Sequence, residues 1–203
     1  MAVPSVSVVI LSHRQDLLPE AFASVRAQTY PDVEIVVKFA DAWWPDKLNA
    51  AIRGTSAEYF CVLCDDDKLA PTWVERTLGA IAAEQADFAY TDNFVFGPLR
   101  LRYALPDFSL TAVQRDCVPH VTALTRRTLW EQLGGYDGAQ PYFDWDFWLR
   151  AAKAGARGAH VRDYLMHYRV WHANGSRSMS HPHALDALAA KHPDLVRPAP
   201  AAA

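Results

Sequence analysis

Strand-like and helix-like segments alternate along the first part of the chain, and this alternation restricts the fold more than any other feature. Apolar runs typical of buried strands occupy residues 5–11, 33–39, 58–63 and 87–91. The intervening segments with helical spacing of apolar residues are 18–28, 47–53 and 71–84. Strands that alternate with helices in this way are typical of a parallel sheet with crossover connections. The sequence therefore predicts an α/β fold with a mainly parallel, Rossmann-like central sheet flanked by helices.

The second part of the chain is less regular. Residues 92–121 show no clear periodicity and contain three prolines. The elements expected beyond them are a strand at 120–125, a helix at 126–133, an aromatic helix at 142–154, a strand at 164–170 and a weak helix at 182–192. We interpret the chain as one domain over residues 1–196, with a regular half (1–91) and a smaller irregular half (92–180). Residues 197–203 are expected to form a flexible tail.

Composition argues against several classes of protein. The chain has 203 residues, 51% of them hydrophobic, which is enough to bury a core without disulfides. Its 20 basic and 23 acidic residues lack the basic excess of a dedicated nucleic-acid binder. No apolar run approaches the about 20 residues that a membrane span needs, and the first such run has no signal-peptide features. A cytoplasmic protein is expected, with peripheral membrane contact left open because of the scattered arginines in 92–121.

Three consecutive aspartates, Asp65 to Asp67, directly follow the apolar segment 58–63. They are expected at the carboxyl edge of the sheet, where open α/β folds bind ligands. Neighbouring carboxylates raise one another's pKa unless a cation lies among them. Mg²⁺ and Mn²⁺ suit carboxylate and phosphate oxygens, so the triplet indicates a metal-bridged diphosphate. The alternative is a solvated acidic turn that caps the helix beginning at Pro71.

Several motifs in a fixed order resemble the family 2 inverting glycosyltransferases, which have the GT-A fold. The motifs are Ser24-Val-Arg-Ala-Gln-Thr-Tyr30, Val33-Glu-Ile-Val-Val37, Lys47-Leu-Asn-Ala-Ala-Ile52, Asp65-Asp-Asp-x-x-x-Pro71, Leu133-Gly-Gly-Tyr-Asp137, Asp144-Trp-Asp-Phe-Trp-Leu-Arg150 and Tyr168-Arg-Val-Trp-His172. The resemblance extends over most of the chain. It implies a compact member of the family, with a nucleotide-sugar-binding half over residues 1–91 and an acceptor half over 92–180.

The resemblance also implies roles for individual residues. Asp144 matches the base that deprotonates the acceptor hydroxyl, and Asp66 is the expected ligand of Mn²⁺ or Mg²⁺. The further expected metal-site residues are Asp67 and His172, and the expected donor contacts are Ser12, His13, Asp41, Lys47 and Asp65. An inverting displacement needs such a base and a cation beside the leaving diphosphate. The donor is a nucleotide-diphosphate sugar, with a UDP-sugar favoured. The acceptor, whether glycan, lipid, protein or small molecule, stays open.

The chain departs from the family's pattern at a few positions. Lys38 and Phe39 stand where an acidic pair usually reads the nucleotide base, and Phe143 replaces the Glu that normally precedes the base. Cys64 stands where many members place the first Asp of the metal motif, although some members use a shifted aspartate pair, as this chain does. Cys61 and Cys64 form a Cys-x-x-Cys, but their side chains point to opposite faces of a strand, which argues against zinc or redox chemistry for the pair.

Plainer interpretations accompany these assignments. Without the resemblance, Asp144 is best explained as a helix N-terminal charge favoured by the helix dipole. Asp146 lies four residues before Arg150, which favours a helical ion pair over a second catalytic acid. Two other functions stay open: a catalytically silent nucleotide- or carbohydrate-binding module of the same fold, and a nucleotidyltransferase. The second is disfavoured because residues 11–15 lack the glycine-rich loop that it needs.

Overall fold

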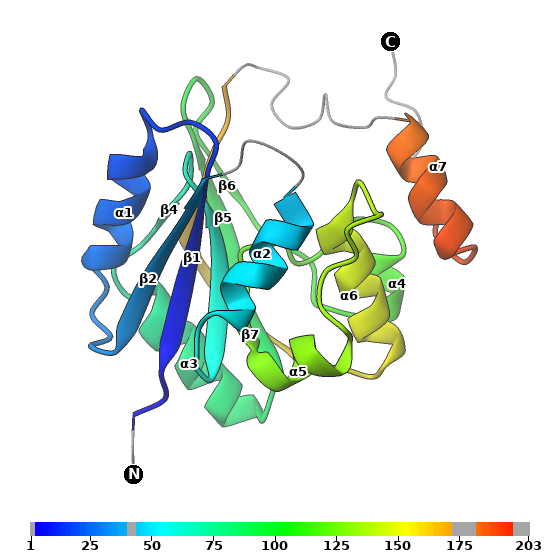
Figure 1. The fold of residues 1–203 in the computed structure, drawn as a ribbon, viewed down its shortest axis with the longest axis horizontal. Coiled ribbons are helices and arrows are strands. Elements are labelled where there is room, and N and C mark those ends of the chain that lie inside the picture. Colours follow the sequence, from blue (N-terminus) through cyan, green and yellow to red (C-terminus); the bar gives the residue numbers. More distant parts are fainter. Residues whose placement is uncertain (1–2, 40–43, 172–181, 197–203) are drawn as a thin grey trace.

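The structure, a computed structural model, describes residues 3–39, 44–171 and 182–196 (Figure 1). Its strands are β1 (Val6–Ser12), β2 (Val33–Phe39), β3 (Tyr59–Cys64), β4 (Lys68–Leu69), β5 (Phe88–Phe96), β6 (Leu101–Tyr103), β7 (Leu124–Arg126) and β8 (Gly158–Arg169). Its helices are α1 (Leu18–Arg26), α2 (Trp44–Arg53), α3 (Trp73–Glu84), α4 (Leu110–Val113), α5 (Arg127–Gln132), α6 (Phe143–Lys153) and α7 (Pro182–Lys191).

The strands form one mixed sheet in the order β2-β1-β3-β7-β5-β8-β4, with β6 paired to β5. Strand β1 is parallel to β2 and β3, and β5 is parallel to β8. The short β7 is antiparallel to both β3 and β5, so β5 and β8 run in the same direction as β1, β2 and β3. The carboxyl ends of these five strands therefore lie at the same edge, the upper edge in Figure 1. The expected α/β fold with a mainly parallel sheet is confirmed.

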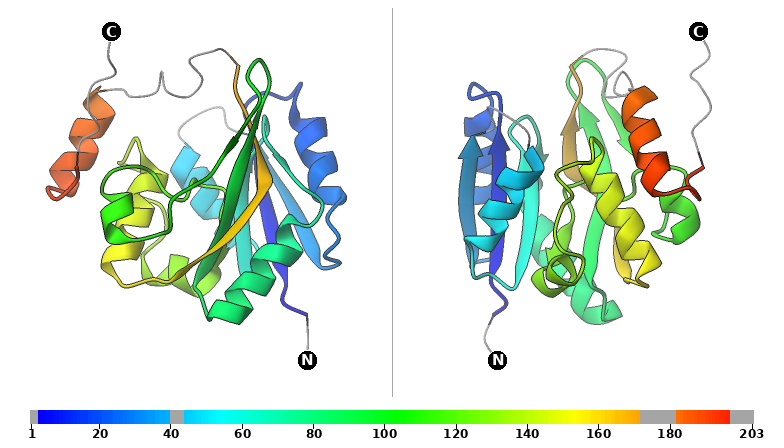
Figure 2. Two further views of the ribbon diagram at one scale, coloured as in Figure 1. Left: turned by 180° about the vertical axis from the view of Figure 1, so that it is seen from behind. Right: turned by 45° about the vertical axis from the view of Figure 1, so that its right-hand side comes forward.

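Strands β1 and β3 read as almost unbroken apolar runs because helices cover both of their faces. Successive residues of β3 alternate between two cores: Phe60 and Val62 belong to one, and Cys61 and Leu63 to the other. The first core is completed by α2, α5 and α6, and the second by α1 and α3 (Figure 2). Consequently Cys64, the last residue of β3, falls on the side of α2 and α6.

An asparagine of α2 joins the regular half of the chain to the irregular half. The Asn49 side chain donates from Nδ2 to the Tyr136 carbonyl at 2.7 Å and accepts at Oδ1 from the Tyr136 N–H at 2.9 Å. Gly135 has a positive φ of +80°, and a Cβ there would lie 2.8 Å from Asn49 Oδ1. The Lys47-Leu-Asn motif and the Leu133-Gly-Gly-Tyr motif are therefore two sides of one buried contact.

Most of the elements predicted from the sequence are present in the structure, but the ends of some differ from the prediction. Helix α2 begins at Trp44, three residues before the expected start, and α3 begins at Trp73 rather than at Pro71. Strands β5 and β8 are longer than expected because they pair with each other along most of their length. The strand expected at 120–125 shrinks to β7, and β4, β6 and α4 were not predicted. The tail expected at 197–203 lies outside the described residues.

We expect Asn49→Ala to lower the free energy of unfolding by about 1–3 kcal/mol, because it leaves the buried N–H and C=O of Tyr136 without their partner. Urea unfolding followed by circular dichroism measures this. Arg53→Ala, on the exposed side of the same helix, should stay within about 0.5 kcal/mol of the wild type. An equal loss of unfolding free energy in both variants would show that the Asn49 hydrogen bonds make no specific contribution to stability.

Candidate functional site

The loops after β1 and β3 meet at Asp65. Ser12 donates from Oγ to Asp65 Oδ2 at 3.0 Å, and the backbone N–H of Arg14 donates to the same oxygen. The Asp65 N–H in turn donates to the Leu11 carbonyl at 3.1 Å. Both Ser12 and Asp65 are buried. The structure thus brings together two residues that the sequence assigned to the donor, and one oxygen of Asp65 already holds the β1 loop in place.

Asp67 is a buried carboxylate with few partners. Its side chain is only 4% exposed, and its Oδ1 accepts a hydrogen bond from the Arg169 N–H at 2.8 Å. In the described part of the chain no donor reaches its second oxygen, Oδ2. Burial raises the pKa of Asp67 well above its ordinary value, and the neighbouring charge of Asp66 raises it further. A cation beside Asp67 would remove this penalty.

Asp66 lies beside Asp67 and is partly exposed. Its Oδ2 accepts a hydrogen bond from the Trp171 indole Nε1 at 3.0 Å, and its carbonyl accepts from Arg169 Nε at 2.8 Å. Cys64, Asp66 and Asp67 each offer one ligand atom, and these three atoms lie within 4.8 Å of one another. The donor set and the uncompensated charge of Asp67 therefore fit a divalent metal ion, and Asp66 and Asp67 are brought together as expected.

Basic and aromatic side chains from the β1 loop, from β4 and from the end of β8 lie around the acidic turn. The Arg14 guanidinium lies 3.9 Å from the centre of the Trp171 ring. Arg169 and Lys68 both pair with Glu20, at 2.9 and 3.1 Å, and these hydrogen bonds lower the pKa of the Glu20 carboxyl. Sequence reasoning gave no role to these arginines or to Trp171. The available signal was that Arg169 and Trp171 lie inside the Tyr168–His172 motif.

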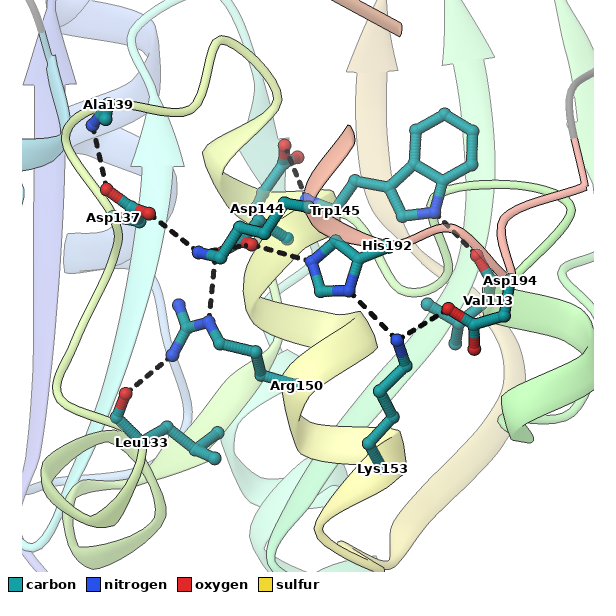
Figure 3. Close-up of polar contacts among 12 residues, drawn as sticks. Val113, Leu133, Asp137, Ala139, Asp144, Trp145, Arg150, Lys153, His192 and Asp194 are labelled. Atoms are coloured by element: carbon teal, nitrogen blue, oxygen red, sulfur yellow. Dashed lines mark hydrogen bonds and ion pairs between the residues drawn. The ribbon is translucent and has the colours of Figure 1, made fainter. Parts of the chain in front are cut away.

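Asp144 lies in the first turn of α6, near the same edge of the sheet (Figure 3). Its Oδ1 accepts from the Trp145 N–H at 2.9 Å, and its Oδ2 accepts from Cys117 Sγ at 3.6 Å. Burial raises the pKa of Cys64 well above normal, and the charges of the three aspartates and of Asp144 raise it further. The charges of Asp144 and of the acidic turn therefore act on the same group, the thiol of Cys64.

His120, a histidine that the sequence analysis did not single out, is near enough to Asp144 for that charge to affect its pKa. The His120 ring stacks on Tyr168, with 5.8 Å between the ring centres and 15° between their planes. Burial lowers the pKa of His120, whereas the negative charge of Asp144 acts in the opposite direction. His120 comes from the loop before β7, so no local pattern connected it with α6.

The remaining predicted residues are less informative. His13 is exposed in the loop after β1, and Lys47 donates from Nζ to the Phe39 carbonyl at 3.2 Å. Phe39 itself is 55% exposed at the end of β2. Asp41 and His172 lie outside the described residues.

Asp146, two residues further along α6, is an ion-pair residue, as expected. Its Oδ2 accepts from Arg150 Nε at 2.8 Å, and its Oδ1 lies 2.8 Å from both Lys191 Nζ and His192 Nε2. Figure 3 shows part of this cluster, which also includes Lys153. Burial opposes ionisation of Asp146, but the hydrogen bonds from Lys191 and His192 and the charge of Arg150 outweigh it and lower its pKa. The cluster fixes α6 against the last residue of α7 and the residue that follows it.

Comparisons with known proteins agree with the fold. No protein-family model matches the sequence. YwdF of Bacillus subtilis strain 168, described as an uncharacterized glycosyltransferase, is 30% identical over 116 residues, which cover 52% of this chain and 42% of that protein. Among the described residues, no helix is long and apolar enough to cross a membrane.

Two solved structures extend this similarity to most of the chain. Residues 1–349 of Staphylococcus aureus TarS, in complex with UDP-GlcNAc, match with a TM-score of 0.72 at 12% identity, over 92% of this chain and 66% of that one. The mannosyltransferase PcManGT of Pyrobaculum calidifontis, in complex with GDP-Man and Mn²⁺, matches with a TM-score of 0.71 at 16% identity, over 93% of this chain and 64% of that one. The chain thus has the GT-A glycosyltransferase fold that its motifs predicted. It spans less than two thirds of each of these relatives.

We expect Asp146→Asn to lower the free energy of unfolding at neutral pH by about 3 kcal/mol, because it breaks a buried ion pair on one side only. The folded-state pKa of Asp146 is lowered, so its stabilisation is present above the unfolded pKa of about 3.9 and is lost as pH falls through the folded value. Urea unfolding at several pH values below neutral should therefore show a smaller difference between variant and wild type at the most acidic pH. Glu58→Gln, in a half-exposed ion pair, should change stability by less than about 1 kcal/mol. A pH-independent Asp146→Asn effect would contradict this account.

Proposed function

We propose that the protein is an inverting, metal-dependent glycosyltransferase that moves a sugar from a nucleotide-diphosphate donor to an acceptor hydroxyl. The observation that carries the proposal is the placement of the Asp66–Asp67 pair and of Asp144 at one edge of the sheet. A cation site and a base are the two groups that such a displacement needs. The two similar solved structures are complexes with UDP-GlcNAc and with GDP-Man. These ligands support a nucleotide-diphosphate sugar as the donor.

In this proposal Asp66 and Asp67 hold Mn²⁺ or Mg²⁺, and His172 is a further candidate ligand. The bound ion neutralises charge on the departing diphosphate. Asp67 suits this role, because burial and the charge of Asp66 raise its pKa more than Arg169 lowers it, and a bound cation would offset that cost. The Arg169 guanidinium contacts the Asp66 carbonyl, and the Arg14 guanidinium lies over the Trp171 ring, so both add positive potential where the diphosphate would lie.

Asp144 serves as the base. Its carboxylate accepts the proton of the acceptor hydroxyl while that oxygen forms a bond to the anomeric carbon of the sugar. The bond from this carbon to the diphosphate oxygen breaks on the opposite face, so the configuration inverts and the nucleoside diphosphate leaves.

The residues around the β1 loop are assigned to the donor. Ser12, His13, Lys47 and Asp65, with Asp41, are proposed to contact the nucleotide, and a UDP-sugar is the first choice. The exposed Lys38 and Phe39 at the end of β2 replace the acidic pair of the family, and they favour a second candidate, a silent binding module of the same fold. Hydrolysis of a sugar nucleotide in the absence of acceptor separates the enzyme from the binding module.

The donor is identified by a thermal-shift panel of UDP, GDP, dTDP and CDP, each with and without Mn²⁺. A ligand at about 100 times its Kd stabilises the folded state by about 2.7 kcal/mol, which raises the Tm of a domain of this size by several degrees, roughly 5–10 °C. We expect one nucleotide to act only when the metal is present, and Asp66→Ala to abolish that shift. A panel without any shift would contradict the donor site.

Asp144→Asn should keep the metal-dependent nucleotide shift and lose about 10²–10⁴-fold in the rate of sugar-nucleotide hydrolysis or transfer, because it removes the proton acceptor. Chromatographic release of the nucleoside diphosphate measures the rate. Asp163→Asn, in an exposed ion pair with Arg76, is the control that keeps the wild-type rate. Full activity of Asp144→Asn would refute its role as the base.

A further inference from the structure

Cys64 replaces a carboxylate at the edge of the proposed metal site. We propose that its sulfur is a third ligand, and that the site consequently prefers thiophilic divalent ions such as Zn²⁺, Co²⁺ or Cd²⁺ over Mg²⁺. This inference rests on the metal site of the proposed function. It concerns a residue by which this chain departs from the family's pattern.

The backbone places the thiol on the side of the site. Cys64 ends β3 on the face that carries Phe60 and Val62, which is the face covered by α2 and α6. Its Sγ lies within 4.8 Å of ligand atoms of both Asp66 and Asp67. Ligand atoms around one tetrahedral ion lie about 3.5 Å apart when the metal–ligand distances are about 2.0–2.3 Å. Small side-chain rotations therefore suffice to bring the three atoms around one ion.

The third ligand atom of the group is the sulfur of Cys64, and not an oxygen of Asp65. Asp65 is turned toward β1, where its Oδ2 accepts from Ser12 and from the Arg14 N–H, and it is not part of the three-residue group. Asp67, by contrast, is buried and has an oxygen that no donor in the described part of the chain reaches. A carboxylate oxygen of this buried residue lies within 4.8 Å of Cys64 Sγ, so a cation bound by Asp67 would also be within reach of the sulfur.

The chemistry of the donor set then decides the preference. Mg²⁺ takes oxygen ligands and keeps much of its water, whereas thiolate ligands favour softer ions. When a sulfur–metal bond forms, the Sγ proton leaves to solvent, and the oxidation states of sulfur and metal do not change. Two carboxylates and one thiolate also leave coordination positions for water or for diphosphate oxygens.

The test is a titration of the whole protein with Co²⁺ or Cd²⁺ alone, read by ultraviolet absorption. A sulfur-to-metal charge-transfer band should grow and saturate near one equivalent. It should disappear in Cys64→Ser and Cys64→Asp. It should persist in Cys61→Ala, which removes the thiol on the opposite face of the same strand. Circular dichroism shows that each variant is folded.

A competition experiment gives a second readout. Cys64→Asp should shift the ratio of Zn²⁺ to Mn²⁺ affinities, measured by calorimetry, toward Mn²⁺ by about tenfold or more. The proposal is overturned if the wild type shows no band, or if the band survives in Cys64→Ser. If Mn²⁺ still binds in those cases and Asp66→Ala abolishes that binding, the proposed function stands and only the role of Cys64 fails. If no divalent ion binds at all, both fail.

Discussion

Repulsion among three consecutive carboxylates organises the surroundings of the acidic turn. Asp65 accepts hydrogen bonds from the Ser12 hydroxyl and from a backbone N–H of the loop after β1. Asp66 accepts one from the indole of Trp171. Asp67 receives one backbone N–H from Arg169. These donors come from segments far apart in the sequence, and they meet because β1, β3 and β8 end at the same edge. The pKa of Asp67 stays raised despite these contacts, and this is the physical basis of the cation site proposed above.

The unusual order of the sheet explains how β8 reaches this turn. Strand β7 pairs only with the beginnings of β3 and β5, at Tyr59–Phe60 and at Phe88–Ala89. Toward the carboxyl edge, β3 and β5 therefore have no strand between them in the described part of the chain. The small β4, directly after the acidic turn, pairs instead with Met166 and His167 of β8. This pairing carries Arg169 and Trp171 across to the aspartates.

Helix α6 connects this edge with the second half of the protein. Its apolar face, with Trp145, Phe147 and Trp148, is buried in the core on the α2 side of the sheet. Its polar face is fixed by the Asp146 cluster, in which Arg150 also donates to the carbonyls of Leu133 and Gly135. A helix held from both sides positions Asp144 without help from a flexible loop. Such rigidity is what a base needs for in-line chemistry.

Local patterns predicted the parts of the structure that depend on local forces. The apolar runs located β1 and β3, the aspartate triplet located the turn, and the i,i+4 rule identified the Asp146–Arg150 pair. The partners of Asp146 from α7 and the Asn49–Tyr136 contact, which spans 87 positions, depend on tertiary packing and leave no local signature. Arg169 contacts Asp67 through its backbone N–H, so the type of side chain at position 169 could not reveal this contact. Strands of two or three residues, such as β4 and β6, are too short to show a period.

Trp171 links Asp66, a ligand of the proposed metal site, to the end of β8. The indole occupies Oδ2 of Asp66 and leaves Oδ1 for a cation, so the two contacts are compatible. An outer hydrogen bond of this kind fixes the orientation of a ligating carboxylate. The Arg14 guanidinium lies over the same indole, 3.9 Å from the ring centre, and the Arg14 N–H donates to Asp65. Within the proposed function, the first loop and the end of β8 therefore orient the metal-binding turn together, and the donor would meet a carboxylate already held in place.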